Sequence, residues 1–568
     1  MLFIRLLYFI YLIGSLFFLT THSTLAAPDI GAYQYASAPV PTLTINGRQD
    51  EILLYPGQPF TANIELNAGD MHDQVADWWL VAVIGDTFFS YDLNAQTWQV
   101  GLHPAKQAPL SSFDTMSVAT GTLTPGIYDV YFGVDTQADG QLSNSLRYTH
   151  VQMNIVESGQ RILSVSIQGD DNNSGTLQQP WKTFSHAVSQ SQPGDIIWVR
   201  EGSYKQQLAP LNSGAENKPI IFAAYPGETV ILNGKGVDLE KNVAQVTPFD
   251  GLIHLNAVNY VWIVGFQIKN SAEMGIMVYD SDNIVIQDNY TYGTASSGIA
   301  VWKSQNIIVD GNEVEKANVS LPQENMSIGE DVKNFEIRYN HIHHGTNTNN
   351  GGEGLDIKDG SSFGHIHHNH IHDIPTKLCL YIDAWDTLTQ ELYIHHNRLH
   401  DCDPHGLAIT AERGGELKNI HVYNNLIYKN GMIGIHLGAG FQPDTDGIYI
   451  YNNSFYDNGT QGDFGASIVL KNRKAKNVSV FNNLCASRFA QISKLTDIQN
   501  LTVSNNLFIQ EQDKWNGEIN GDNFVIGDPL FVDPKAGDFR LQTGSPARSA
   551  GSDKLVPTND FTNVFQLE

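Results

Sequence analysis

LYIHHN (392–397), IHVYNN (420–425) and IYIYNN (448–453) repeat one pattern, an alternating strand that ends in an asparagine. The asparagine recurs at gaps of 23 to 30 residues, the length of one coil of a parallel β-solenoid with three short strands. Stacked coils bring these asparagines to the same bend, where each side-chain amide can hydrogen-bond the next. The predicted structural ladder consists of Asn289, Asn312, Asn340, Asn369, Asn397, Asn425, Asn453, Asn483 and Asn506.

The residues before the ladder predict how the solenoid begins. PWKTFSHAV (180–188) contains one short amphipathic segment, which we expect to be helical from Trp181 to Val188. Its apolar face would cap the N-terminal end of the solenoid core. The solenoid is predicted to occupy residues 160–550.

The region before residue 157 follows a different pattern. Short alternating strands such as PFTANIEL (59–66) and GIYDVYFGV (126–134) are separated by Gly, Pro and Asp turns. This pattern predicts an antiparallel β-sandwich, immunoglobulin-like in class, as a domain over residues 27–157. A spacer role and a carbohydrate-binding role both remain open for this domain.

The N-terminus is typical of a secretory signal. One Arg precedes a long apolar run, and Thr24 and Ala26 stand where small residues favour cleavage. We predict a signal peptide over residues 1–26 and a secreted protein, extracellular or periplasmic. The alternative is a transmembrane anchor, but no positive flank follows, and no other stretch is long enough to span a membrane. Residues 551–568 are predicted to be a tail.

Charge and cysteine content narrow the function. The formal net charge of −27 argues against nucleic acid as a partner, and it would also repel a polyanionic substrate unless a cation or a basic patch intervened. Three cysteines are too few for a disulfide scaffold, and Cys379 and Cys402 either pair or remain buried thiols.

Several segments together resemble a known superfamily. They are GDDNNSG (169–175), PWKTFSHAV (180–188), KPIIFAAYPGETVILNG (218–234) and GDPLFVDPKAGDFRLQTGSPARSAG (527–551). With the asparagine repeat, they resemble the right-handed parallel β-helix of the pectin-lyase-like superfamily, and the family-nine pectate lyases are the most similar in style. The resemblance implies an all-β, right-handed β-helix. It does not fix the activity, because lyases, hydrolases, epimerases and non-catalytic solenoids share this fold.

A second strand of each coil carries the candidate chemistry. In GLDIKD (354–359) and CLYIDA (379–384), Leu and Ile are expected in the core, so the residues between them point outward. Asp383 is then directly over Lys358 and diagonal to Asp356. The first outward column is predicted to read His254, Met277, Ala300, Ser327, Asp356, Tyr381, Ala408 and His436, and the second Asn256, Tyr279, Trp302, Gly329, Lys358, Asp383, Thr410 and Gly438.

Aromatic residues beside carboxylates and a lysine favour a saccharide cleft, because sugar rings stack on aromatic faces and sugar carboxylates meet charges. The predicted substrate-binding residues are Tyr279, Trp302, Tyr381, Trp385 and His436.

The preferred hypothesis is β-elimination of a uronate-containing acidic polysaccharide by a monomeric protein. The resemblance implies a Lys or Arg base and calcium held by aspartates. Lys358 is then the base and Arg413 neutralises charge, while Ca²⁺ binds Asp356, Asp359 and Asp383. Three carboxylates raise a lysine pKa, so this role requires the cation to offset them.

Four alternatives remain open at this point. An inverting hydrolase would use Asp356 with Asp383, or Asp383 with Glu412, as acid and base. DPH (403–405) resembles a tripeptide of alginate epimerases, although it precedes the strand here. The charges could also form only a salt-bridge cluster, or the solenoid could be a non-catalytic adhesin.

HIHHNHIHD (365–373) and YIHHNRLHD (393–401) have a His-x-His spacing that places two imidazoles on one strand face. Tyrosine follows histidine in the same column, and tyrosine replaces histidine well in stacking but poorly as a zinc ligand. A stacked ladder is therefore preferred over a metal site. The column is predicted to read His343, His372, His400, Tyr428 and Tyr456.

Overall fold

The computed structural model describes residues 29–32, 38–157, 161–239, 250–346, 351–440, 442–461, 465–509 and 521–552. The predicted signal peptide and nearly all of the predicted tail lie outside these residues. The chain divides into two compact units, a smaller one within residues 34–156 and a larger one that ends at Ser552.

The smaller unit consists of two mainly antiparallel β-sheets, consistent with the predicted sandwich. Its core contains Trp78 and Phe132, which are 2% and 0% exposed. One sheet has the order β1 (Val40–Ile45), β3 (Phe60–Asn67) and β8 (Phe113–Gly121). The other has the order β2 (Glu51–Leu54), β10 (Leu146–Ile155), β9 (Gly126–Asp135), β4 (Val75–Ile84), β5 (Thr87–Asp92) and β6 (Thr97–Val100), with β7 (Lys106–Pro109) paired to β4 and a 3₁₀ turn at Gly69–Met71.

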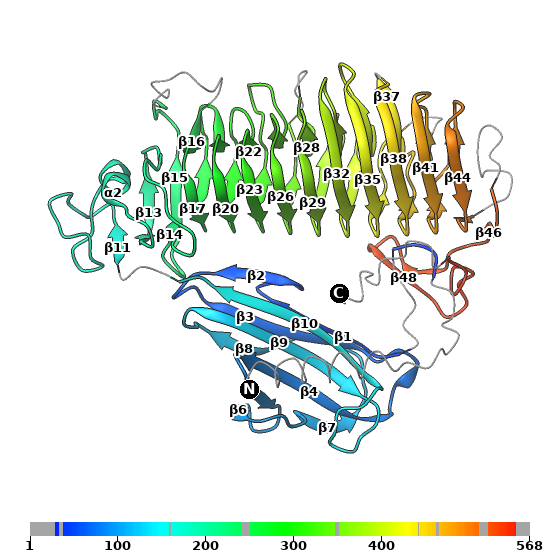
Figure 1. The fold of residues 1–568 in the computed structure, drawn as a ribbon, viewed down its shortest axis with the longest axis horizontal. Helices are drawn as coiled ribbons and strands as arrows, with labels where there is room; N and C mark the ends of the chain where they lie inside the picture. Colours follow the sequence, from blue (N-terminus) through cyan, green and yellow to red (C-terminus); the bar gives the residue numbers. More distant parts are fainter. Residues whose placement is uncertain are drawn as a thin grey trace, which may run out of the picture. The chain divides into compact units, whose positions relative to one another are not determined.

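The larger unit is a parallel β-helix whose coils from β16 (Gly251–Asn256) to β45 (Leu507–Phe508) each pass through three sheets (Figure 1). Sheet 1 contains β11 (Ile162–Val165), β12 (Ile196–Val199), β14 (Ile220–Ala224), β17 (Asn259–Val264), β20 (Asp282–Gln287), β23 (Gln305–Asp310), β26 (Lys333–Arg338), β29 (Ser362–His367), β32 (Leu388–His395), β35 (Glu416–Tyr423), β38 (Asp444–Tyr451), β41 (Ala475–Phe481) and β44 (Gln499–Ser504).

Sheet 2 contains β13 (Gly202–Tyr204), β15 (Val230–Asn233), β18 (Gln267–Lys269), β21 (Tyr290–Tyr292), β24 (Glu313–Glu315), β27 (His341–His343), β30 (His370–Ile374), β33 (Arg398–Cys402), β36 (Leu426–Tyr428), β39 (Ser454–Tyr456), β42 (Leu484–Ala486), β45 (Leu507–Phe508) and β46 (Val525–Ile526). Sheet 3 contains β16 (Gly251–Asn256), β19 (Met274–Tyr279), β22 (Ile299–Trp302), β25 (Met326–Gly329), β28 (Leu355–Lys358), β31 (Leu380–Asp383), β34 (His405–Ala411), β37 (Ile433–Gly440), β40 (Ala466–Leu470) and β43 (Ala490–Lys494). A hairpin of β47 (Phe531–Asp533) and β48 (Asp538–Leu541) follows the last coil.

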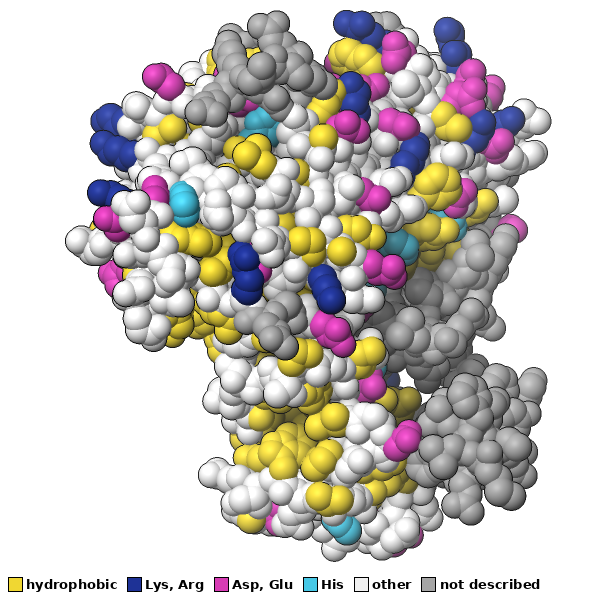
Figure 2. Space-filling model, turned by 60° about the vertical axis from the view of Figure 1, so that its left-hand side comes forward, with side chains coloured by type: hydrophobic (Ala, Val, Ile, Leu, Met, Phe, Trp, Pro, Cys, Tyr) yellow, Lys and Arg dark blue, Asp and Glu magenta, His cyan; other side chains and the backbone are white. Residues whose placement is uncertain are grey.

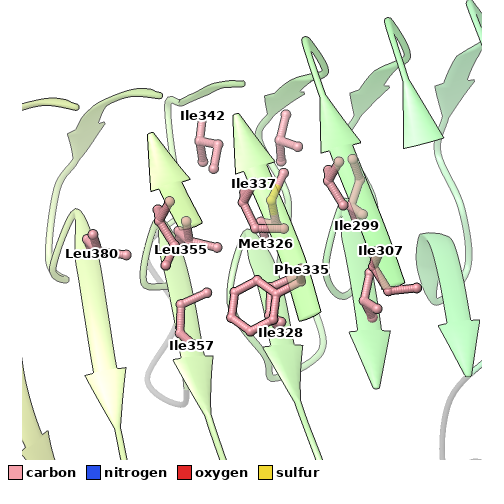
Figure 3. Packing of buried hydrophobic residues seen from close by; sticks show 14 of the residues in the cluster. Ile299, Ile307, Met326, Ile328, Phe335, Ile337, Ile342, Leu355, Ile357 and Leu380 are labelled. Atoms are coloured by element: carbon pink, nitrogen blue, oxygen red, sulfur yellow. The ribbon is translucent and has the colours of Figure 1, made fainter. Parts of the chain in front are cut away.

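Stacked aliphatic side chains fill the interior of the β-helix (Figure 3). In sheet 3, Ile299, Met326, Leu355 and Leu380 are register partners on successive strands, and all four are 0% exposed. Since side chains alternate along a strand, this inward column fixes Asp356 and Lys358 on the outward face.

The asparagine repeat forms a continuous buried ladder. Each side-chain amide from Asn289 to Asn483 donates to the side-chain oxygen of the next asparagine at 2.9–3.1 Å. Each also donates to a backbone carbonyl, as Asn397 does to Ile366 O at 2.8 Å. A second link of this kind, which the sequence reasoning missed, joins Asn430 to Asn458 at 3.0 Å.

The N-terminal cap differs in detail from the prediction. Helix α2 (Phe184–Gln190) begins three residues later than expected, because the Thr183 side chain accepts a hydrogen bond from His186 N and caps it there. Trp181 precedes the helix but is 5% exposed and packs in the β-helix core.

The segment 29–32 and two of the cysteines form further links within the β-helix. Residues 29–32 belong to the larger unit, not to the sandwich as the predicted boundary at residue 27 implied, since Ile30 N donates to Ala547 O and Ala32 N to Ser454 Oγ, both at 2.9 Å. Cys379 and Cys402 form a disulfide, and Cys485 is a buried thiol.

Candidate functional site

The outward columns of sheet 3 have the predicted register. Ser327, Asp356, Tyr381 and Ala408 are successive partners, and Lys358 pairs with Asp383. The side chains are much less exposed than an open cleft would require, and Asp356 and Asp383 are 3% and 1% exposed. The chemistry therefore lies in a largely buried polar cluster.

Lys358 has a different principal partner from the three aspartates expected. Its Nζ donates to Glu324 Oε1 at 2.7 Å, and Asp356 Oδ2 is 3.7 Å away. Glu324 lies just before β25, one coil earlier in the chain. Burial alone would lower the pKa of Lys358, but the charges of Glu324 and Asp356 outweigh it and raise the pKa above its usual value.

Sequence reasoning missed both Glu324 and Glu353, although a signal for them exists. Each lies two residues before the first core residue of its strand, Met326 or Leu355, and these two core residues are register partners. Comparing the residues that precede each strand, as well as those within it, would have paired the two glutamates. Glu353 forms an ion pair with Lys377 at 3.3 Å.

The cluster carries more negative than positive charge. Its carboxylates are Glu324, Glu353, Asp356 and Asp383, and its ammonium groups are Lys358 and Lys377. Burial raises the pKa of Asp356 well above its usual range and also raises that of Glu353, and the neighbouring carboxylates add to both shifts. Glu324 Oε2 and Asp356 Oδ1 are buried without a hydrogen-bond partner.

The donor chemistry of the cluster suits a hard divalent cation such as Ca²⁺. Carboxylate oxygens are its preferred ligands, and four carboxylates against two ammonium groups leave two formal negative charges to offset. The unpartnered oxygens of Glu324 and Asp356 supply unused ligand atoms. Since protonation of these carboxylates is the alternative way to offset the charge, cation and proton would compete.

Asp383 is held by backbone amides. Its Oδ1 accepts from Trp385 N at 2.8 Å and from Glu412 N at 3.0 Å. Burial raises the pKa of Asp383 to about 6, although the two amide donors oppose the shift. A pKa of about 6 lies in the range that a general acid or base can use.

Asp359 has different neighbours from Asp356. It belongs to a hollow of about 560 Å³ at the end of the sheet 3 strands, and burial and the charges of Glu330 and Asp386 raise its pKa. Among the described residues, neither Asp356, Asp359 and Asp383 nor Glu324, Glu353 and Asp356 form a group whose ligand atoms all lie within 4.8 Å of one another. The residues that line the hollow are Asp280, Lys303, Glu330, Asp331, Asp359 and Thr387.

The aromatic residues divide into buried and open ones. Tyr279 and Trp302 are 2% and 3% exposed and pack with Met274, Met277 and Ala300, which corrects the expectation that they offer open faces. Trp302 Nε1 donates to Ser327 Oγ at 3.1 Å. Their large side chains fill the outward face of β19 and β22.

Three predicted residues lie farther along sheet 3 or just after its strands. Trp385 is partly exposed, and the Arg413 guanidinium lies 4.4 Å from its ring centre. Glu412 is exposed, and its backbone amide, not its side chain, contacts Asp383.

The last two predicted residues are buried. His436 is 8% exposed and lies 3.1 Å from His405, Nδ1 to Nε2. Tyr381 is also 8% exposed, and burial followed by the charges of Asp383 and Asp356 raises its pKa.

The family model for the Pel9A-like, right-handed β-helix region matches residues 163–477, more than half of the chain. The chain belongs to this family. The Pel9A-like region covers β12 to β41 almost completely and includes the whole carboxylate cluster. The predicted superfamily and fold class are thereby confirmed.

Individual relatives match shorter segments. The uncharacterized protein YwoF of Bacillus subtilis is 33% identical over 139 residues, which are 23% of this chain and 28% of that protein. Pectate lyase PEL9 of Emericella nidulans is 27% identical over 139 residues, 23% of this chain and 34% of that enzyme. The matches thus span about a third or less of these curated relatives. The crystal structure of pectate lyase Pel9A is similar over 68% of this chain and 91% of its own, with 12% identity and a TM-score of 0.44.

The surface has no continuous basic track on the face that Figure 2 shows, where Lys and Arg lie scattered among Asp and Glu. In the described part of the chain, no helix is long and apolar enough to cross a membrane.

Proposed function

We propose that this Pel9A-like protein is a secreted lyase that cleaves a uronate-containing polysaccharide by β-elimination, with Ca²⁺ at the carboxylate cluster of sheet 3. The observation that carries the proposal is the buried excess of carboxylates around Lys358, with unpartnered oxygens on Glu324 and Asp356. The Cys379–Cys402 disulfide supports an extracytoplasmic location.

Glu324, Glu353 and Asp356 are the proposed calcium ligands, with Asp383 beside them, and their side chains must move closer together to hold one ion. Bound calcium would engage the uronate carboxylate and acidify the proton on the adjacent carbon. This assignment keeps Asp356 from the sequence hypothesis and replaces Asp359, which lies in the hollow with Glu330 and Asp331.

Lys358 is the proposed base. In β-elimination the base takes the proton α to the carboxylate, a carbon–carbon double bond forms, and the glycosidic carbon–oxygen bond breaks with its electron pair leaving on oxygen. Lys358 must first lose its own proton, and the charges of Glu324 and Asp356 oppose that loss. Offsetting these charges is therefore a condition for the base role.

Arg413 and Trp385 are the proposed outer part of the site. The guanidinium over the indole ring presents a positive charge and an aromatic surface together, a combination that suits a sugar acid.

The test is a panel of pectate, alginate and glycosaminoglycans, each with Ca²⁺ and with a chelator. A lyase forms an unsaturated uronate that absorbs in the ultraviolet, and the proposal expects this signal with one polymer and its loss on chelation. Lys358→Ala should abolish this signal. Lys333→Ala is the matched control, because Lys333 is a more exposed lysine that forms an ion pair with Asp331. Full activity in Lys358→Ala would refute the base assignment, and reducing ends without ultraviolet absorbance would refute the lyase.

The second candidate is an inverting glycoside hydrolase, and one observation favours it. Burial places the pKa of Asp383 at about 6 and raises that of Asp356, so one carboxyl of the pair could hold the proton that a general acid needs. Products without a double bond would select this alternative.

A further inference from the structure

The outward face of sheet 2 carries a cluster of histidines that the proposed activity does not use. Two adjacent columns run across β27, β30 and β33, with His341 over His370 and His343 over His372, which is followed by His400. These residues lie on a different sheet from Lys358 and the carboxylate cluster.

The imidazoles form hydrogen bonds across the two columns. His341 Nε2 is 2.7 Å from His372 Nε2, and His370 Nε2 is 2.7 Å from His400 Nε2. One ligand nitrogen from each of His341, His370 and His372 lies within 4.8 Å of the other two. Zinc–nitrogen bonds of about 2.0–2.1 Å place two tetrahedral ligand nitrogens about 3.3 Å apart, so a small separation of the His341 and His372 rings would admit one ion in place of their hydrogen bond.

A carboxylate orients one of these rings. His372 Nδ1 lies 2.7 Å from Asp373 Oδ2, so its Nδ1–H donates to the carboxylate and the Nε2 lone pair faces His341. Metal-binding histidines commonly have such a carboxylate partner, which fixes the tautomer and makes the other nitrogen a better ligand.

Acidic residues border the cluster at its N-terminal side. Glu313 pairs with His341 in register, and Glu313, His341 and His343 also have ligand atoms within 4.8 Å of one another. Two overlapping ligand sets thus share His341, and a carboxylate oxygen is available beside the imidazoles.

Stacking alone does not account for this arrangement. Ring stacking explains why His343, His372 and His400 succeed one another, with interplanar angles of 7° and 3°. The nitrogen contacts across the two columns are N–H···N hydrogen bonds, from His341 to His372 and from His370 to His400, and an ion bound between the rings would replace the first of them. One coil further, Arg398 and Tyr428 occupy the corresponding diagonal, joined Nε to Oη at 2.7 Å, and offer no such ligand pair.

We propose that His341, His370 and His372 form a binding site for a zinc-class divalent transition metal ion. Imidazole nitrogen selects zinc, copper and nickel, whereas calcium prefers oxygen ligands. The site is independent of the proposed lyase activity.

Zinc binding to the full-length chain tests the site. The protein is stripped with a chelator and titrated with Zn²⁺ in the calorimeter in the presence of excess Ca²⁺. We expect one tight site that calcium does not occupy. His341→Asn should weaken binding at least tenfold, and His365→Asn should not change it. His365 is a matched control, because it is an exposed histidine stacked on Tyr393 at 4.9 Å and contributes to none of the ligand sets.

Asp373→Asn provides a second variant that keeps all three imidazoles. It should weaken zinc binding about tenfold, in line with the usual effect of removing such a partner. Weakening in His341→Asn with an unchanged melting temperature of the metal-free protein supports the site. Absence of zinc binding by the wild type, or equal affinity in wild type and His341→Asn, would overturn it.

Discussion

The asparagine ladder and the carboxylate cluster are both groups of buried polar side chains in the same coils, yet they differ in how their polar atoms are satisfied. In the ladder, Asn397 donates to Asn425 and to Ile366 O and accepts from Asn369. In the cluster, Glu324 Oε2 and Asp356 Oδ1 have no hydrogen-bond partner.

The difference follows from the chemistry of the two groups. An amide carries a donor and an acceptor, so identical side chains satisfy one another when coils stack. Carboxylates are acceptors only, and identical ones repel, so a stack of them needs a cation or protons. The ladder therefore stabilises the fold by itself, whereas the cluster needs a cation or protons to offset its remaining charge.

Breaking the ladder should have the largest effect. Asn397→Ala removes the acceptor for Asn369 and the donor to Ile366 O, both buried, which should destabilise the β-helix by about 3–5 kcal/mol. Urea unfolding followed by circular dichroism measures this loss. Asn172→Ala, an exposed turn residue, should stay within about 0.5 kcal/mol of wild type. Equal effects of the two would contradict a ladder that carries stability.

Breaking the cluster should act on the cation more than on the fold. Glu324→Gln removes one charge and one proposed ligand, so calcium affinity should fall about 10–100-fold, with a similar loss of lyase rate. Calcium titration by calorimetry measures it, and Asp331→Asn, an exposed aspartate of the hollow, is the control. If Asp359→Asn weakens calcium binding as much as Glu324→Gln does, the ligands predicted from the sequence (Asp356, Asp359 and Asp383) are favoured over Glu324 and Glu353.

The pH dependence of the lyase rate should reveal the titration of Asp383. If the ionised carboxylate is required, kcat/KM should fall about tenfold per pH unit below about pH 6, where Asp383 becomes protonated. Because its folded pKa lies above the unfolded value of 3.8, the same carboxyl favours folding increasingly as pH falls from about 6 toward 4. A pH–rate profile of wild type and Asp383→Asn checks this. An inflection near pH 6 that persists in the variant would assign the titration elsewhere.

The smallest effect is expected outside the buried cluster. Arg413→Ala removes an exposed cation–π contact with Trp385, worth about 0.5–1 kcal/mol, so the melting temperature should hardly change. KM for the polysaccharide should rise several-fold because a positive charge is lost, whereas Arg413→Lys should retain most of the affinity. An unchanged KM in Arg413→Ala would remove this residue from the proposed site.

Much of the geometry could be predicted because a strand alternates with a period of two and the asparagine fixes the coil. These two facts placed Lys358 beside Asp383 and Asp356 beside Tyr381 correctly. They did not predict how far the side chains are buried, and Trp302 was wrongly expected to be open. Burial depends on neighbours one coil away, and the pattern within one strand does not contain them.

The sequence by itself determined the repeat, the inward and outward faces of each strand and the family. Only the tertiary structure decided which charges meet. Glu324 lies in the loop before β25, and Lys358 lies at the end of β28, 34 residues later in the chain. Lys358 Nζ is nevertheless 2.7 Å from Glu324 Oε1. The length of a coil fixes register along the backbone, whereas the partner of a long flexible side chain depends on burial and on the summed charge of every coil around it.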